Sequence, residues 1–142
     1  MPHRIDCDSQ TKYVYCFVSG ITTHNALAKA FMETSDIAKM LNYSSVIIDL
    51  RKAEMKNTIT NIYQTIKNFE SFGFTKWHNL AIIKNNDHER NSFAETVLYN
   101  LGWSNVKLLS NPSEAIEWIK SIRNGPQMPQ SPLQPPGVNG SA

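Results

Sequence analysis

Three short apolar runs place the tightest limit on what this chain folds into. They occupy residues 13–18, 46–50 and 80–83, and only Asp49 among them is charged. The first run is rich in aromatic and β-branched residues and shows no polar alternation. Strands that are apolar on both faces are typical of parallel sheets covered by helices. We therefore expect an α/β protein.

Amphipathic helical patterns fill the gaps between these runs. The clearest spans residues 57–73, where apolar side chains recur three and four positions apart. The complete pattern predicts strands at 3–8, 12–19, 46–50, 80–84 and 106–110. It predicts helices that end near 42, 73, 102 and 122 and begin at 22 or 23, at 57 or 58, at 87 or 91, and at 111. The order ββαβαβαβα predicts a mixed, mostly parallel sheet that begins with an antiparallel hairpin.

Turn and capping residues set the expected ends of these elements. Gly20 closes the second strand, residues 51–57 form a polar connection, and the first helix breaks near 33–36. Asn111 is followed by a proline and, three residues after it, by Glu114. This arrangement is typical of a helix N-cap, with proline at the first helical position.

The composition changes abruptly at the end of the last helix. Residues 124–142 contain no charged residue and hold five of the 7 prolines. Such a segment has too little apolar surface to offset its ordering entropy. We expect one α/β domain at residues 1–123 and a disordered, proline-rich tail at 124–142.

Charge and cysteine content limit the partners and the compartment. Lys plus Arg number 14 and Asp plus Glu 12, a balance that indicates neither a nucleic-acid nor an anionic-membrane partner. Cys7 and Cys16 are too few for a disulfide scaffold. Residues 1–10 lack the apolar run of a signal peptide, and no apolar run approaches the roughly 20 residues of a membrane span. We expect a cytoplasmic protein.

Standard catalytic signatures are absent from the sequence. It contains no glycine-rich phosphate loop, no CxxC pair and no Gly-x-Ser-x-Gly elbow. Asp87, His88 and Glu89 are candidate metal ligands, but consecutive residues seldom converge on one ion, and a helix-capping loop explains them equally well. We therefore expect no enzyme activity, no cofactor and no metal.

The most suggestive polar feature is the connection after the second apolar core run. It leads to a helix start, where unpaired N–H groups and a partial positive charge attract anions and tolerate phosphorylated hydroxyls. The simpler interpretation is that these residues only cap and solubilise the helix. The candidate interaction or anion site comprises Asp49, Arg51, Lys56, Asn57, Thr58 and Thr60.

The combined pattern is similar to that of a known family. The stretches that carry the similarity are 13–23, 46–51, 80–83 and the closing Pro-Ser-Glu-Ala-Ile-Glu-Trp-Ile at 112–119. On these, residues 3–122 resemble the SpoIIAA-like proteins of the STAS superfamily (sulfate-transporter and anti-sigma-factor-antagonist domains). The resemblance implies the same fold and a non-catalytic regulatory role in binding another protein.

In anti-sigma-factor antagonists of this family, an Asp-Ser-Ser-Gly-type motif at the second helix start is phosphorylated by a partner kinase. The corresponding residues 57–60 are Asn-Thr-Ile-Thr, with no preceding Asp and no following Gly, and Ile59 falls near the position of the phosphorylated serine. If a switch operates here, Thr58 is the first candidate for phosphorylation and Thr60 the second. The implied partners are a regulator, a kinase-like protein or a second copy of the chain.

An excess of aromatic residues supports an alternative function. These rings can line a pocket for a small ligand or lipid, or they can simply fill the core. Phe72, Phe74 and Trp77 lie within one predicted connection, where they form either a homodimer surface or a buried junction. The aromatic residues in question are Tyr13, Tyr15, Phe17, Tyr63, Phe69, Phe72, Phe74 and Trp77.

Overall fold

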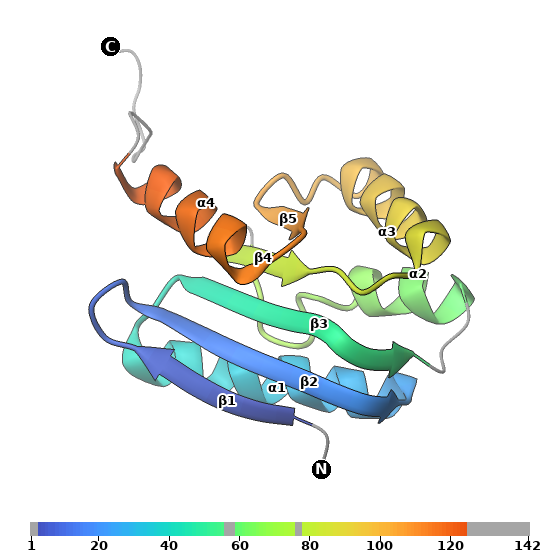
Figure 1. Ribbon diagram of the computed structural model, residues 1–142, viewed down its shortest axis with the longest axis horizontal. Helices are drawn as coiled ribbons and strands as arrows, with labels where there is room; N and C mark the ends of the chain where they lie inside the picture. Colours follow the sequence, from blue (N-terminus) through green and yellow to red (C-terminus); the bar gives the residue numbers. More distant parts are fainter. Residues whose placement is uncertain (1–2, 56–58, 76–77, 125–142) are drawn as a thin grey trace.

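Five strands and four helices make up the described part of the chain. The computed structural model describes residues 3–55, 59–75 and 78–124 (Figure 1). The elements are β1 (His3–Asp8), β2 (Tyr13–Thr22), α1 (His24–Leu41), β3 (Ser45–Met55), α2 (Ile59–Lys67), β4 (Asn79–Ile83), α3 (His88–Asn100), β5 (Val106–Leu109) and α4 (Pro112–Asn124).

The strands form one sheet in the order β1-β2-β3-β4-β5. β1 and β2 are antiparallel, and the remaining neighbours are parallel. At the tip of the β1–β2 hairpin, the Lys12 N–H donates to the Asp8 carbonyl at 2.8 Å, and the Thr11 N–H donates to the Asp8 carboxylate at 3.0 Å. The predicted fold class and element order are confirmed.

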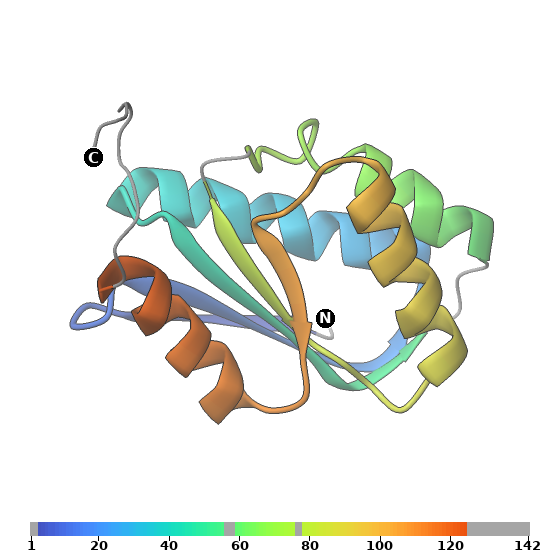
Figure 2. The ribbon, with the colours of Figure 1, turned by 90° about the horizontal axis from the view of Figure 1, so that it is seen from above.

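Helices cover both faces of this sheet. Successive right-handed crossovers that step in one direction across a sheet leave their helices on the same face. Accordingly α1, α2 and α3 share one hydrophobic core cluster, built on strand residues such as Val46 and Ile48. α4 lies on the opposite face, where Ala115 and Ile119 pack with Ile47. Figure 2 shows the strands between α1 and α4.

Aromatic rings fill much of the larger core. Phe31 lies 5.4 Å from Phe69 between ring centroids and 5.9 Å from Phe74, and Trp103 lies 5.4 Å from Phe69. Phe69 and Phe74 are fully buried, and Phe72 stacks on Phe31 at 6.1 Å. Of the two interpretations of Phe72 and Phe74, the buried junction is therefore the one found. Trp77 lies outside the described residues.

The predicted break in the first helix is wrong, because α1 is continuous from His24 to Leu41. Thr34 and Ser35, which suggested the break, are fully buried. The Thr34 hydroxyl donates to the Ala30 carbonyl at 2.7 Å, so it is satisfied within the helix. Ser35 faces Gly73, where a Cβ atom would collide with the serine hydroxyl. Small polar residues here let the chain after α2 approach α1 closely.

The second and third strands run further than predicted. β2 continues past Gly20 to Thr22, and β3 continues to Met55, so residues 51–55 are strand rather than a connection. The two extensions pair with each other after a register shift between Phe17 and Ser19. Polar residues are compatible with strand structure here because only one face of the extended strand is buried. The charged side chains of residues 51–55 are exposed, while their backbone groups pair between the two strands.

Capping residues fix the helix ends mostly as predicted. The Glu114 N–H donates to the Asn111 side chain at 2.9 Å, and the Glu114 carboxylate accepts from the Ser110 N–H at 3.0 Å. Thr23 caps α1 and Asp87 caps α3 through their side chains. α2 is shorter than predicted: it ends at Lys67, and turns carry the chain on to Gly73, because Phe69 leaves the helical path to enter the core.

None of the helices in the described residues is long and apolar enough to cross a lipid bilayer. α4 extends to Asn124, one residue beyond the predicted domain boundary. The rest of the proposed tail, residues 125–142, lies outside the described residues.

Candidate functional site

Asp49 lies in the middle of β3 on the face that α4 covers. Ile47 and Asp49 are two positions apart on one strand and therefore point to the same face. Ile47 packs in the cluster formed with α4. Asp49 pairs in register with Phe17 of β2 and Ile83 of β4, and its side chain is fully buried. A buried carboxylate needs hydrogen-bond donors close to it.

Tyr15 and Arg51 supply these donors. The Tyr15 hydroxyl donates to Asp49 Oδ2 at 2.5 Å. The Arg51 guanidinium donates through Nη2 to Oδ2 at 2.8 Å and through Nε to Oδ1 at 3.0 Å, and the Arg51 backbone N–H donates to Oδ1 at 3.1 Å. This two-pronged geometry is the one in which arginine binds a carboxylate most specifically. We call these three residues the Tyr15–Asp49–Arg51 network.

The ionisation states within this network are fixed. Burial by itself raises the pKa of the Asp49 carboxyl, but hydrogen bonds from Arg51 and Tyr15 outweigh it and hold that pKa below its ordinary value. Burial and the adjacent carboxylate raise the pKa of the Tyr15 phenol well above its ordinary value. A general acid or base works best with a pKa near the working pH. Both shifts move away from that range, so the network is suited to holding Arg51 in place rather than to moving protons.

Arg51 brings positive charge to the surface at the edge of this network. Its side chain is 41% exposed although its carboxylate partner is fully buried. Phe17 pairs with Asp49, so a regular ladder would pair Ser19 with Arg51. The register shift pairs Ser19 with Lys52 instead. Such a bulge re-aims side chains, and it places both cations on the Tyr15 face of the sheet.

An aromatic ring adjoins these cations. Phe17, half-buried, lies on the same face as Tyr15, and the Arg4 guanidinium stands 5.6 Å from its ring centroid. We call Arg4, Phe17, Arg51 and Lys52 the β2–β3 surface. A cation with a half-buried ring beside it is a combination often found where proteins bind one another.

The remaining residues of the predicted site fall where the structure gives no side-chain geometry. Lys56, Asn57 and Thr58 lie outside the described residues. Thr60 belongs to α2, but its side chain is outside the described part as well. The structure therefore brings together Asp49 and Arg51 of the predicted set and adds Tyr15, Phe17 and Lys52 to them.

Of the residues that the structure adds to the candidate site, Tyr15 and Phe17 were not expected there from the sequence. The sequence pattern places them in a buried strand without polar alternation, and counts them among the rings that line a ligand pocket or fill the core. A signal was present, however: an aspartate inside an apolar strand requires a donor on a neighbouring strand, and a tyrosine is one of the few apolar-strand residues that can provide one.

Among the candidate metal ligands Asp87, His88 and Glu89, Asp87 has a structural role. Asp87 caps α3 and accepts from the Arg90 guanidinium at 3.1 Å. The described residues include no group of three His, Cys, Asp or Glu side chains placed to hold a metal ion. His78 accepts the Thr75 N–H at 3.0 Å, and its pKa is lowered by burial and by the nearby Lys39.

The fold and this site define a mixed α/β domain with a rigid cation-bearing surface on its sheet. No family model matches the chain, and no curated protein matches it either. Among solved structures, the chain is similar to one described as the Bacillus cell fate determinant SpoIIAA in its phosphorylated form. The two share 12% identity at a TM-score of 0.47, over 82% of this chain and 98% of that one. A second is the anti-sigma factor antagonist SpoIIAA in its unphosphorylated form, with 10% identity, a TM-score of 0.49, and coverage of 86% of this chain and 98% of that one.

Proposed function

We propose that this protein is a non-catalytic regulatory module that acts by binding another protein, and that the β2–β3 surface is its docking site. The observation that carries the proposal is the exposed Arg51 guanidinium, held by a fully buried carboxylate. A cation fixed before binding loses little side-chain entropy when a partner carboxylate meets it. The sequence resemblance to SpoIIAA-like proteins favours the same kind of function.

The partner should offer an acidic group beside an apolar side chain. Arg51 and Lys52 present positive charge, and the half-buried ring of Phe17 presents apolar area next to it. Arginine and aromatic residues contribute disproportionately to protein interfaces. The Arg4 side chain is paired with Asp6 at 3.4 Å and is 72% exposed, so it belongs to the rim of this surface.

A phosphorylation switch at the adjoining segment belongs to the same proposal. Thr58 follows Met55, the last residue of β3, by three positions, so at most about 11 Å of backbone separates its Cα atom from the strand end. A phosphate there would add about −1.5 to −2 charges next to a surface that attracts acidic groups. A phosphate on Thr58 would then compete with the partner for Arg51 and release it. We place this function in the cytoplasm.

The test is recovery of a partner with the tagged protein from its native host. Arg51→Gln should lower recovery about tenfold, as expected for an arginine at the centre of an interface. The substituted amide can still donate to Asp49, so the fold should survive. Lys107→Ala, an exposed lysine on the distant strand β5, is the matched control and should change nothing.

Equal recovery by Arg51→Gln and Lys107→Ala would contradict the proposed surface. If the chain only self-associates, sedimentation of the purified protein will show a dimer, and the same two variants report whether the β2–β3 surface forms it. Phosphosite mapping on the native protein, with Thr58→Ala and Thr58→Glu in the same recovery assay, tests the switch separately. Normal release of the partner by Thr58→Ala would end that part of the proposal.

A further inference from the structure

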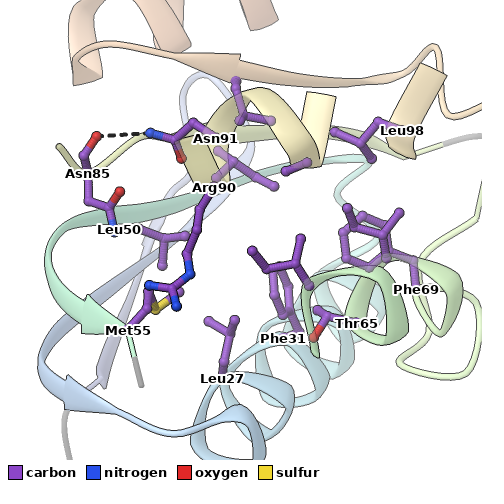
Figure 3. A pocket seen from close by; sticks show the side chains of 15 residues that line it. Leu27, Phe31, Leu50, Met55, Thr65, Phe69, Asn85, Arg90, Asn91 and Leu98 are labelled. Carbon is purple, nitrogen blue, oxygen red and sulfur yellow. Dashed lines mark hydrogen bonds between the residues drawn. The ribbon is translucent and has the colours of Figure 1, made fainter. Parts of the chain in front are cut away.

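A cavity of about 80 Å³ lies on the opposite side of the sheet from the β2–β3 surface. It sits between α1, α2 and α3, above the end of β4 (Figure 3). Asn85, Arg90 and Asn91, which follow the carboxyl end of β4, contribute polar groups to its lining. Its apolar wall is formed mainly by Leu27, Phe31, Leu50, Ile62, Ile66 and Leu98.

One charged side chain enters this apolar space. Arg90 lies in the first turn of α3, and Figure 3 shows its side chain running across the cavity toward Met55. One edge of the guanidinium donates to the Asp87 carboxylate at 3.1 Å. The Nε atom, in contrast, is buried and has no hydrogen-bond partner in the described residues. A buried N–H without an acceptor is costly, so this atom requires an explanation.

The neighbouring polar groups at the mouth are largely engaged with each other. The Asn91 amide donates to the Asn85 carbonyl at 3.1 Å, and the Asn85 side-chain oxygen accepts the Asp87 N–H at 3.0 Å. These bonds fix the segment between β4 and α3. Neither supplies an acceptor to Arg90, whose unpaired Nε remains available to a ligand.

We propose that this cavity binds a short-chain monocarboxylic acid, with its hydrocarbon chain among the helices and its carboxylate on the Nε edge of Arg90. A carboxylate matches the fork of a guanidinium, and an arginine keeps its charge at every physiological pH. The Asp87 carboxylate on the other edge disfavours a dianion such as a phosphate monoester.

The size of the cavity limits the chain length. A cavity of about 150 Å³ holds a benzene molecule, so about half that volume holds roughly three carbon atoms. An acid of about four to six carbons therefore places roughly its last three carbons in the interior, with the remaining carbons and the carboxylate at the mouth beside Arg90. This site is independent of the proposed docking function, since it uses the other face of β3 and none of the residues of the β2–β3 surface.

The test uses amide NMR titrations of the full chain with three probes of equal chain length: hexanoate, hexan-1-ol and hexan-1-amine. We expect saturable shifts from hexanoate around Leu27, Ile62 and Leu98, and binding of the amine at least about tenfold weaker because like charges oppose it. Equal binding of hexanoate and the amine, or shifts confined to other parts of the protein, would overturn the proposal.

Two variants separate the charge from the cavity. Arg90→Gln removes the charge and the ion pair with Asp87, and the fold should persist because that pair is partly exposed and contributes little to stability. Hexanoate binding should fall about tenfold while hexan-1-ol binding stays unchanged. Ala94→Leu places a larger side chain in the wall and should weaken both. The control is Arg4→Gln, an arginine 72% exposed on β1, which should alter neither. Undiminished hexanoate binding by Arg90→Gln would refute the role of Arg90 even if Ala94→Leu fails to fold.

Discussion

Replacing Asp49 by asparagine should destabilise the protein by about 2–3 kcal/mol, although the side chain keeps its size. The Tyr15 hydroxyl and the Arg51 backbone N–H lose a charged acceptor, at about 1 kcal/mol each. The Arg51 guanidinium is 41% exposed and is rehydrated when its partner is neutral, so its loss is only about 0–1 kcal/mol.

Urea unfolding of wild type, Asp49→Asn, Arg51→Gln and the double variant measures this directly. Because Asp49 and Arg51 share hydrogen bonds, their effects should not add, and the double variant should be more stable than the sum of the singles predicts. Tyr15→Phe is the matched control for the hydroxyl and should cost about 1 kcal/mol. An Asp49→Asn variant within about 0.5 kcal/mol of wild type would refute the reasoning.

The same comparison has a defined pH dependence. The pKa of Asp49 is lower in the folded state than in the unfolded chain, so its contribution to stability is complete above the unfolded value of about 3.9. That contribution is lost as the pH falls further, through the folded-state pKa. The difference between wild type and Asp49→Asn should therefore be constant from pH 7 to 5 and shrink below about pH 4. A difference that grows in acid would contradict the assigned hydrogen bonds.

Three further predictions rest on other parts of the fold. Gly73→Ala should lower the free energy of unfolding in urea by about 2–4 kcal/mol, because Gly73 has φ +108° and faces Ser35. Gly20→Ala, at φ +78° with no atom within 4 Å of the new Cβ, should lower it by only about 1 kcal/mol. Equal losses would show that the contact of Gly73 with α1 is unimportant. A thiol reagent should label one cysteine in the native protein and two in denaturant, because Cys7 is exposed whereas Cys16 is buried and its thiol has a raised pKa. Labelling of both cysteines under native conditions would contradict this. Asn111→Ala should lower stability by about 1 kcal/mol through loss of the α4 cap, and an unchanged melting temperature would refute the capping role.

The sequence predicted best those features that are encoded locally. The cap of α4 needs only Asn111, the following proline and Glu114, so its signal survives without any knowledge of the fold. The break expected in α1 failed for the opposite reason. Ser35 looks unfavourable inside a helix until Gly73, distant in sequence, is seen to lie against it, and Thr34 is satisfied by the Ala30 carbonyl.

The residues of the candidate site also fall into two groups, those that the sequence predicts locally and those that only the tertiary structure brings together. Asp49 and Arg51 are two residues apart, and the sequence shows them as a polar pair near the end of the predicted strand at 46–50. Tyr15 joins them only through the register between β2 and β3, which depends on hydrogen bonding between strands. Arg90 was hidden because its segment looked like a capping loop, and the empty space beside it exists only when three helices are packed together.

The strand order β1-β2-β3-β4-β5 has a consequence for how the protein forms. Every strand pairs only with the strand just before or just after it in the chain. From β2 onward, each newly made strand therefore finds the neighbour that precedes it in the chain already available for pairing. Each parallel pairing still spans a whole crossover helix, so these contacts are distant in sequence and form more slowly than a hairpin. The sheet can grow strand by strand during synthesis, and α4, made last, closes the second face over strands already in place.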